Sequence, residues 1–132
     1  MPNFRSATSI KRVRGLGAAH EGVQHWWHQR LTAAGNLVLL LWFGASLILL
    51  PDLGHATVAG WIAQPLVAIP LALLALSTAW HMRLGVQVMI EDYVHAEGSR
   101  LLALVLLNFF AVGIVAVSLF AILKLALGAP DA

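Results

Sequence analysis

The chain has 132 residues, of which 60% are hydrophobic and 11% are charged, with a formal net charge of +2 and no cysteine. A soluble domain carries about 25% charged residues, so the composition excludes an ordinary water-soluble domain and predicts an integral membrane protein in contact with lipid. The lack of cysteine excludes disulfides, thiol catalysis and iron–sulfur ligation by this chain.

The N-terminal segment, residues 1–30, concentrates the positive charge. Its basic residues are Arg5, Lys11, Arg12, Arg14 and Arg30. Their position before the first apolar run is typical of a segment that sets membrane orientation and not of a nucleic-acid-binding face. We expect a cytoplasmic tail and then an interfacial entry, with Trp26 and Trp27 in the aromatic belt. The apolar run begins later than the core of a cleavable signal peptide, so we expect an uncleaved first helix.

Three apolar runs predict three transmembrane helices, at about residues 31–50, 64–90 and 100–127. Each is long enough to cross a hydrocarbon core about 30 Å thick, which takes about 20 helical residues. The predicted fold class is therefore all-α, with a three-helix transmembrane anchor domain over residues 31–127 and a C-terminal tail over 128–132.

The segments between the spans carry turn and cap residues. Pro51 to His55 ends the first span, and a short interfacial piece around Trp61 is expected before Pro65 opens the second. Ser99 is the expected N-cap of the third span. Because basic residues favour the cytoplasmic side, the N-terminus and the 91–99 loop are predicted to be cytoplasmic, with the C-terminus outside.

The second span contains a histidine. His81 lies 12 residues before Tyr93, which on a helix is about 18 Å and places it near the middle of the membrane. An ionisable residue at that depth is costly and suggests a functional site. The alternative is a neutral imidazole that only hydrogen-bonds a neighbouring helix.

A stripe of one helix face runs from Ser77 through His81 and Gly85 to Asp92. The two small residues would leave room for a flat macrocycle beside the imidazole, a usual axial ligand of heme iron, and would equally allow close helix packing. The spans hold no second histidine. If the iron has two protein ligands, another chain supplies the other, which predicts a hetero-oligomeric helical bundle.

Asp92 and Tyr93 lie where the second span leaves the bilayer. Tyrosine at this level is commonly an interfacial anchor. Asp92 places negative charge at a helix C-terminus, where the helix dipole disfavours it, so solvent or a cation from a partner chain must stabilise it. A phenol beside a carboxylate is also able to donate a hydrogen bond to a quinone carbonyl.

The segment from His81 to Val94 resembles the H-x3-G-x6-D-Y-V pattern of the smaller, hydrophobic membrane anchor of succinate dehydrogenase. The resemblance implies that His81 ligates heme b and that Tyr93 binds ubiquinone, with Asp92 in support. The entry to the first span, Gly22-Val23 followed by Arg30-Leu31-Thr32-Ala33, is similar to the family's G-V-…-R-x-T-A stretch.

That second motif implies a heme environment that includes Arg30, near a propionate. The family often has a histidine directly after Gly-Val. Here Gln24 stands in its place and His25 follows one position later, so His25 is a weaker match to the heme environment.

The resemblance implies an anchor of respiratory complex II in the bacterial inner membrane. Its partners would be a flavoprotein that oxidises succinate, an iron–sulfur protein and a second membrane anchor. This chain would share heme b ligation and ubiquinone binding with the second anchor and the iron–sulfur protein. Two alternatives stay open, namely the anchor of a related quinol:fumarate reductase and a heme-free helical scaffold.

The remaining polar residues of the spans have simpler explanations. Arg83 faces away from the His81 stripe and is expected to snorkel to the cytoplasmic side or to pair with a neighbouring chain. Lys124 is expected to snorkel at the opposite membrane face. The expected interhelical hydrogen-bonding residues are Asn36, Asn108 and Ser118.

Overall fold

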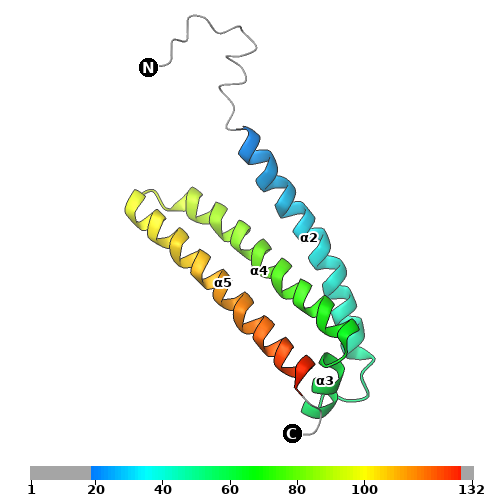
Figure 1. Cartoon of the computed structure of the whole chain (residues 1–132). Helices are drawn as coiled ribbons and strands as arrows, with labels where there is room; N and C mark the ends of the chain where they lie inside the picture. Colours follow the sequence, from blue (N-terminus) through cyan, green and yellow to red (C-terminus); the bar gives the residue numbers. More distant parts are fainter. Residues whose placement is uncertain (1–18, 129–132) are drawn as a thin grey trace, which may run out of the picture.

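The structure is a computed structural model that describes residues 19–128, with side chains from residue 23 onward. This range holds α2 (Ala19–Ile48), α3 (His55–Ile62), α4 (Pro65–Tyr93) and α5 (Glu97–Leu127) and no strand (Figure 1). Three segments are long and apolar enough to span a membrane, namely Val23–Ile48, Pro65–Tyr93 and Glu97–Leu127. The prediction of an all-α protein with three spans is confirmed. The predictions for residues 1–18 and 129–132 lie outside the described residues.

The helix bounds differ from the predicted spans at several ends. Helix α2 begins at Ala19 and not near Leu31, because hydropathy marks only the part of a helix inside the bilayer. The expected interfacial entry is a continuous helical extension of the first span. Helix α4 continues past Ile90 to Tyr93, which places Asp92 and Tyr93 in its last turn.

The N-cap prediction for Ser99 was wrong. Helix α5 begins at Glu97, and Ala96 occupies the cap position. The Ser99 hydroxyl instead donates a hydrogen bond of 3.0 Å to the Ala96 carbonyl. The earlier start puts the acidic Glu97 in the first turn, where the positive end of the helix dipole favours it.

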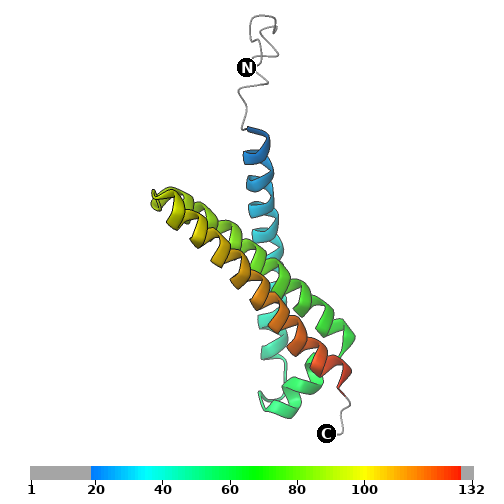
Figure 2. The same cartoon turned by 60° about the vertical axis from the view of Figure 1, so that its left-hand side comes forward.

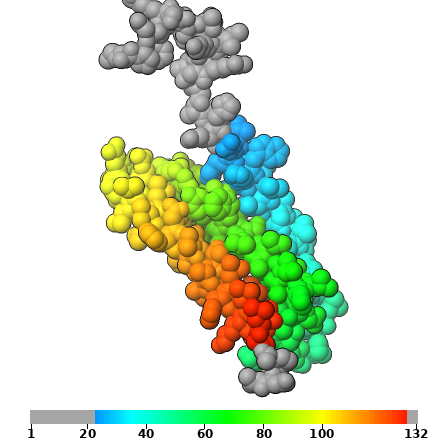
Figure 3. Space-filling view, in the orientation of Figure 1, coloured from blue at the N-terminus to red at the C-terminus, as the bar shows by residue number. Residues whose placement is uncertain are grey.

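Helix α4 is the middle helix of the bundle and packs against both α2 and α5. In Figure 2 helix α2 crosses the α4–α5 pair at an angle, and the space-filling view shows the helices side by side in one continuous layer (Figure 3). The start of α2, the end of α4 and the start of α5 lie toward one end of the bundle, and α3 lies at the other.

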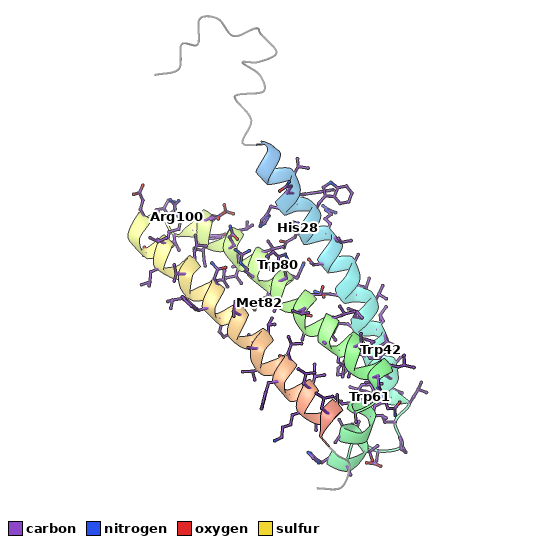
Figure 4. The ribbon with its side chains drawn as sticks, viewed as in Figure 1. His28, Trp42, Trp61, Trp80, Met82 and Arg100 are labelled. Carbon is purple, nitrogen blue, oxygen red and sulfur yellow. The ribbon has the colours of Figure 1, made fainter. Side chains whose placement is uncertain are left out.

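Helix α3 packs against the end of α2 through the side chain of Trp61. The ring of Trp61 stacks on Trp42 with centroids 6.2 Å apart and lies 6.1 Å from Phe43 (Figure 4). In the preceding turn, Asp52 accepts hydrogen bonds from the Gly54 amide and the Thr57 hydroxyl, at 2.7 and 2.9 Å. Helix α3 is thus the short piece expected around Trp61, and its interfacial location stays a prediction.

The chain buries little of its own apolar surface. Only 6% of the most apolar window of the first and third spans is buried, and 17% of that of α4. The small core lies along α4 and α5 and consists of Val67, Ala68, Ala79, Leu84, Leu107 and Ala111. The outward apolar faces are therefore left for lipid and for other chains.

Candidate functional site

His81 lies in the contact between α4 and α2. Its side chain is partly buried, and its Nδ1 atom is 3.0 Å from the hydroxyl oxygen of Thr32. The same hydroxyl lies 2.7 Å from the His28 carbonyl and 3.1 Å from the Gln29 carbonyl. The imidazole therefore has the helix–helix hydrogen bond that one of the sequence interpretations predicted. The bond occupies Nδ1 and leaves Nε2 for another partner.

A hollow of about 390 Å³ opens beside this hydrogen bond. The residues that line it are Trp26, Gln29, Arg30, Ala33 and His81. The exposed Arg30 guanidinium lies 4.7 Å from the centre of the Trp26 ring. The Gln29 side-chain oxygen is buried without a hydrogen-bond partner. The hollow thus combines an aromatic wall, a cation, an unsatisfied acceptor and an imidazole.

The small residues one turn either side of His81 face α2. A methyl group built on Gly85 would lie 3.6 Å from the Gln29 side-chain nitrogen, and one on Gly35 would lie 4.0 Å from the Ser77 hydroxyl. Both are ordinary van der Waals distances. Of the two explanations for Ser77 and Gly85, close helix packing therefore accounts for these contacts, and the macrocycle explanation stays a prediction.

Asp92 and Tyr93 lie apart from the hollow, about 18 Å along α4 from His81. Both are exposed, and Tyr93 keeps 78% of its surface accessible. Among the residues that the structure describes, neither side chain has a hydrogen-bond partner, whereas the adjacent Glu91 accepts a 2.8 Å hydrogen bond from Gln87. Asp92 and Tyr93 are free to contact another chain or a ligand.

The structure thus brings Arg30 to the same hollow as His81. His25 also lies on α2 and is partly buried, but it is not among the residues that line the hollow. The predicted site residues therefore separate into three groups, with His25 in none of them. His81 and Arg30 line the hollow, Ser77 and Gly85 lie in the contact with α2, and Asp92 and Tyr93 lie at the end of α4.

Sequence reasoning missed four residues of the site: Trp26, Gln29, Ala33 and Thr32. One pattern would have found the first three, since Trp26, Gln29, Arg30 and Ala33 follow the i, i+3, i+4, i+7 spacing of one helix face. Thr32 belongs to the R-x-T-A stretch, but its contact with His81 depends on how α2 packs against α4.

Arg83 contacts residues of its own chain on the side of α4 that faces away from His81. Its Nε atom donates a 2.5 Å hydrogen bond to the Asn108 side-chain oxygen, and its guanidinium lies 5.1 Å from the centre of the Trp80 ring. Asn108 also donates to the Leu104 carbonyl at 2.9 Å. The interhelical role predicted for Asn108 is confirmed, and Arg83 has a partner in its own chain.

Asn36 is 8% exposed, and its side-chain oxygen is buried without a partner.

Comparison with known proteins gives consistent matches. Residues 5–115 match the family described as the succinate dehydrogenase/fumarate reductase transmembrane subunit. The chain is 30% identical over 126 residues to the succinate dehydrogenase hydrophobic membrane anchor subunit of Paracoccus denitrificans, covering 96% of this chain and 97% of that one. It is 28% identical to the protein of the same name from Rickettsia bellii, over 83% of this chain and 86% of the relative. It is 31% identical to the succinate dehydrogenase membrane anchor subunit of Reclinomonas americana, over 70% of this chain and 80% of that one.

Proposed function

Because the chain belongs to the succinate dehydrogenase/fumarate reductase transmembrane subunit family, we propose that it anchors succinate dehydrogenase in the membrane and takes part in electron transfer to quinone. The observation that carries the proposal is the similarity to named anchor subunits over nearly the full length of both chains. The three spans agree with an anchor that crosses the membrane several times.

We propose that His81 binds the iron of heme b through Nε2, with the second ligand from the other membrane anchor of the complex. The hollow fits one edge of such a group, because it offers an imidazole nitrogen left free by the Nδ1 contact, an aromatic wall and the Arg30 cation. The guanidinium of Arg30 would pair with a propionate carboxylate. When bound, heme would supply a one-electron carrier. The chain contributes the ligand, the orientation of that ligand and the compensating charge.

We propose that Tyr93 and Asp92 form this chain's part of the quinone site. Their exposure at the end of α4 supports this, because another chain is able to complete the site over them. The phenol hydroxyl of Tyr93 donates a hydrogen bond to a quinone carbonyl, and the Asp92 carboxylate accepts one from the partner chain or orients the phenol. A hydrogen bond to the carbonyl favours reduction, because negative charge grows on that oxygen.

The proposed partners are the second membrane anchor, the iron–sulfur protein and the flavoprotein, with no nucleic acid. The largely exposed apolar faces of α2 and α5 support association with a second membrane chain. The proposed location is the bacterial inner membrane with the N-terminus cytoplasmic. The start of α2, the end of α4 and Arg100 lie toward the same end of the bundle (Figures 1 and 4), as that orientation requires.

Two other functions remain as rivals. An anchor of a fumarate reductase would use the same two sites in the reverse direction, and the family description covers both enzymes. A heme-free scaffold would use the His81–Thr32 hydrogen bond only to join α2 and α4.

Purification through an affinity tag on this chain tests the proposal. We expect a flavoprotein and an iron–sulfur protein to copurify, with succinate-dependent reduction of ubiquinone that a quinone-site inhibitor blocks. Recovery of the chain with neither protein would refute the anchor function. Fumarate reduction by quinol that far exceeds succinate oxidation would favour the first rival, and a complex without a b-type spectrum would favour the second.

A further inference from the structure

The hydroxyl of Thr32 has three polar neighbours and a single proton. Two of the neighbours, the carbonyls of His28 and Gln29, are able only to accept a hydrogen bond, and the third, Nδ1 of His81, either donates or accepts according to the tautomer. The position of the Thr32 proton therefore decides which nitrogen of His81 carries a proton.

The distances favour one assignment. The 2.7 Å from Thr32 to the His28 carbonyl matches an O–H···O bond, for which about 2.7–2.8 Å is typical. The 3.0 Å to Nδ1 matches an N–H···O bond, for which about 2.9–3.0 Å is typical. Donation to a carbonyl one turn earlier is also a common arrangement for threonine in a helix. On these distances we assign the Thr32 hydroxyl as the donor to its own helix and as the acceptor of a hydrogen bond from His81.

We propose that Thr32 is a positioning residue that holds His81 in the Nδ1-protonated tautomer and so presents the Nε2 lone pair to heme iron; this inference rests on the heme ligation proposed above. With the opposite tautomer, the Nε2 atom would carry a proton and could not bind iron. A hydrogen-bond acceptor at Nδ1 also fixes the plane of the ring and raises the basicity of the ligand.

The Thr32–His81 hydrogen bond would also affect the redox potential of a heme bound to His81. An imidazole that donates from Nδ1 gives more electron density to the iron, which stabilises the oxidised state over the reduced state. Removal of the acceptor oxygen should therefore make the heme easier to reduce. Loss of Thr32 packing alone predicts no such direction.

The test is a redox titration of heme b in the purified complex from the wild type and from Thr32→Val and Thr32→Ser. Valine keeps the shape of threonine without its hydroxyl, and serine keeps the hydroxyl. At a fixed ambient potential we expect Thr32→Val to raise the reduced-to-oxidised ratio of the heme by about threefold to tenfold, the scale of one net hydrogen bond. Thr32→Ser should remain within about twofold of the wild type, because the acceptor oxygen is retained.

An unchanged heme b midpoint potential in Thr32→Val would overturn the role of the hydroxyl while leaving the anchor function intact. Equal shifts of that potential in the valine and serine variants would do the same. If Thr32→Val assembles without heme, Thr32→Ala is compared with Thr32→Ser. Heme loss in valine and alanine but not in serine supports the proposal, and heme loss in all three contradicts it. A wild-type complex without heme refutes both this inference and the heme ligation on which it rests.

Discussion

Arg83 of α4 donates a hydrogen bond to Asn108 of α5, on the side of α4 that faces away from His81. Among the side chains that the structure describes, helix α4 therefore makes one hydrogen bond to each neighbour, through His81 to α2 and through Arg83 to α5. The guanidinium also lies over Trp80, so its charge is partly covered by an aromatic ring. These two contacts explain how a middle helix with a small apolar core holds both partners in register.

Replacement of Asn108 by leucine should destabilise the complex by about 1–2 kcal/mol, because Arg83 loses its acceptor in a medium that offers little water. The measurement is the melting temperature of the purified complex in detergent. Asn108→Asp keeps the acceptor oxygen and should retain the wild-type melting temperature or exceed it. Equal melting of wild type and Asn108→Leu would show that this hydrogen bond contributes nothing.

Tyr93→Phe should lower succinate–quinone turnover by about tenfold or more, since the phenol hydroxyl is the proposed donor to the quinone carbonyl. Succinate oxidation with a soluble dye should stay at the wild-type rate, because that reaction ends before the quinone site. Quinone kinetics identical to the wild type would reject the role of Tyr93.

Asp92→Asn should raise the KM for quinone and lower turnover by less than Tyr93→Phe does, because the amide keeps the shape of the carboxylate but not its charge. The matched control is Glu91→Gln, since Glu91 is already paired with Gln87 on its own helix. A larger effect from Glu91→Gln than from Asp92→Asn would contradict the assignment, because it would show that Glu91 and not Asp92 is the functional carboxylate.

Arg30→Gln should make heme b harder to reduce, since a nearby positive charge stabilises the reduced and more negative form. The expected change in the reduced-to-oxidised ratio is about twofold to fivefold, because Arg30 is exposed and its ion pair is screened by water. Arg30→Lys keeps the charge and should show a smaller change. Arg100→Gln, a loss of charge on α5, serves as the control. A shift of equal size in the Arg100 variant would indicate a general effect of net charge.

The sequence predicts the parts of the fold that depend on one helix at a time. Hydropathy locates the three spans, and a count of residues gives the separation of His81 and Tyr93 along α4. The start of α2 at Ala19 was not predicted, because the helix continues outside the apolar run that hydropathy detects. The Ser99 error has a local cause, since both Glu97 and Ser99 are reasonable residues for a helix start.

Contacts between helices were harder to predict. The position of Thr32 against His81 depends on the rotation and register of α2 relative to α4, and neither helix encodes that relation alone. The same holds for Asn108, for which an interhelical role was predicted but not its partner, Arg83. Any residues that other chains would contribute to the proposed quinone site lie outside this chain, so its sequence carries no information about them.

The reduced-minus-oxidised visible spectrum of the complex, purified through a tag on this chain, tests the heme assignment most directly. We expect a b-type band in the wild type and in His95→Leu, which changes a histidine in the loop after α4, and we expect His81→Leu to lose or shift that band. A wild-type complex without the band, or a His81→Leu complex with an unchanged band, would contradict the assignment of His81 as the heme ligand.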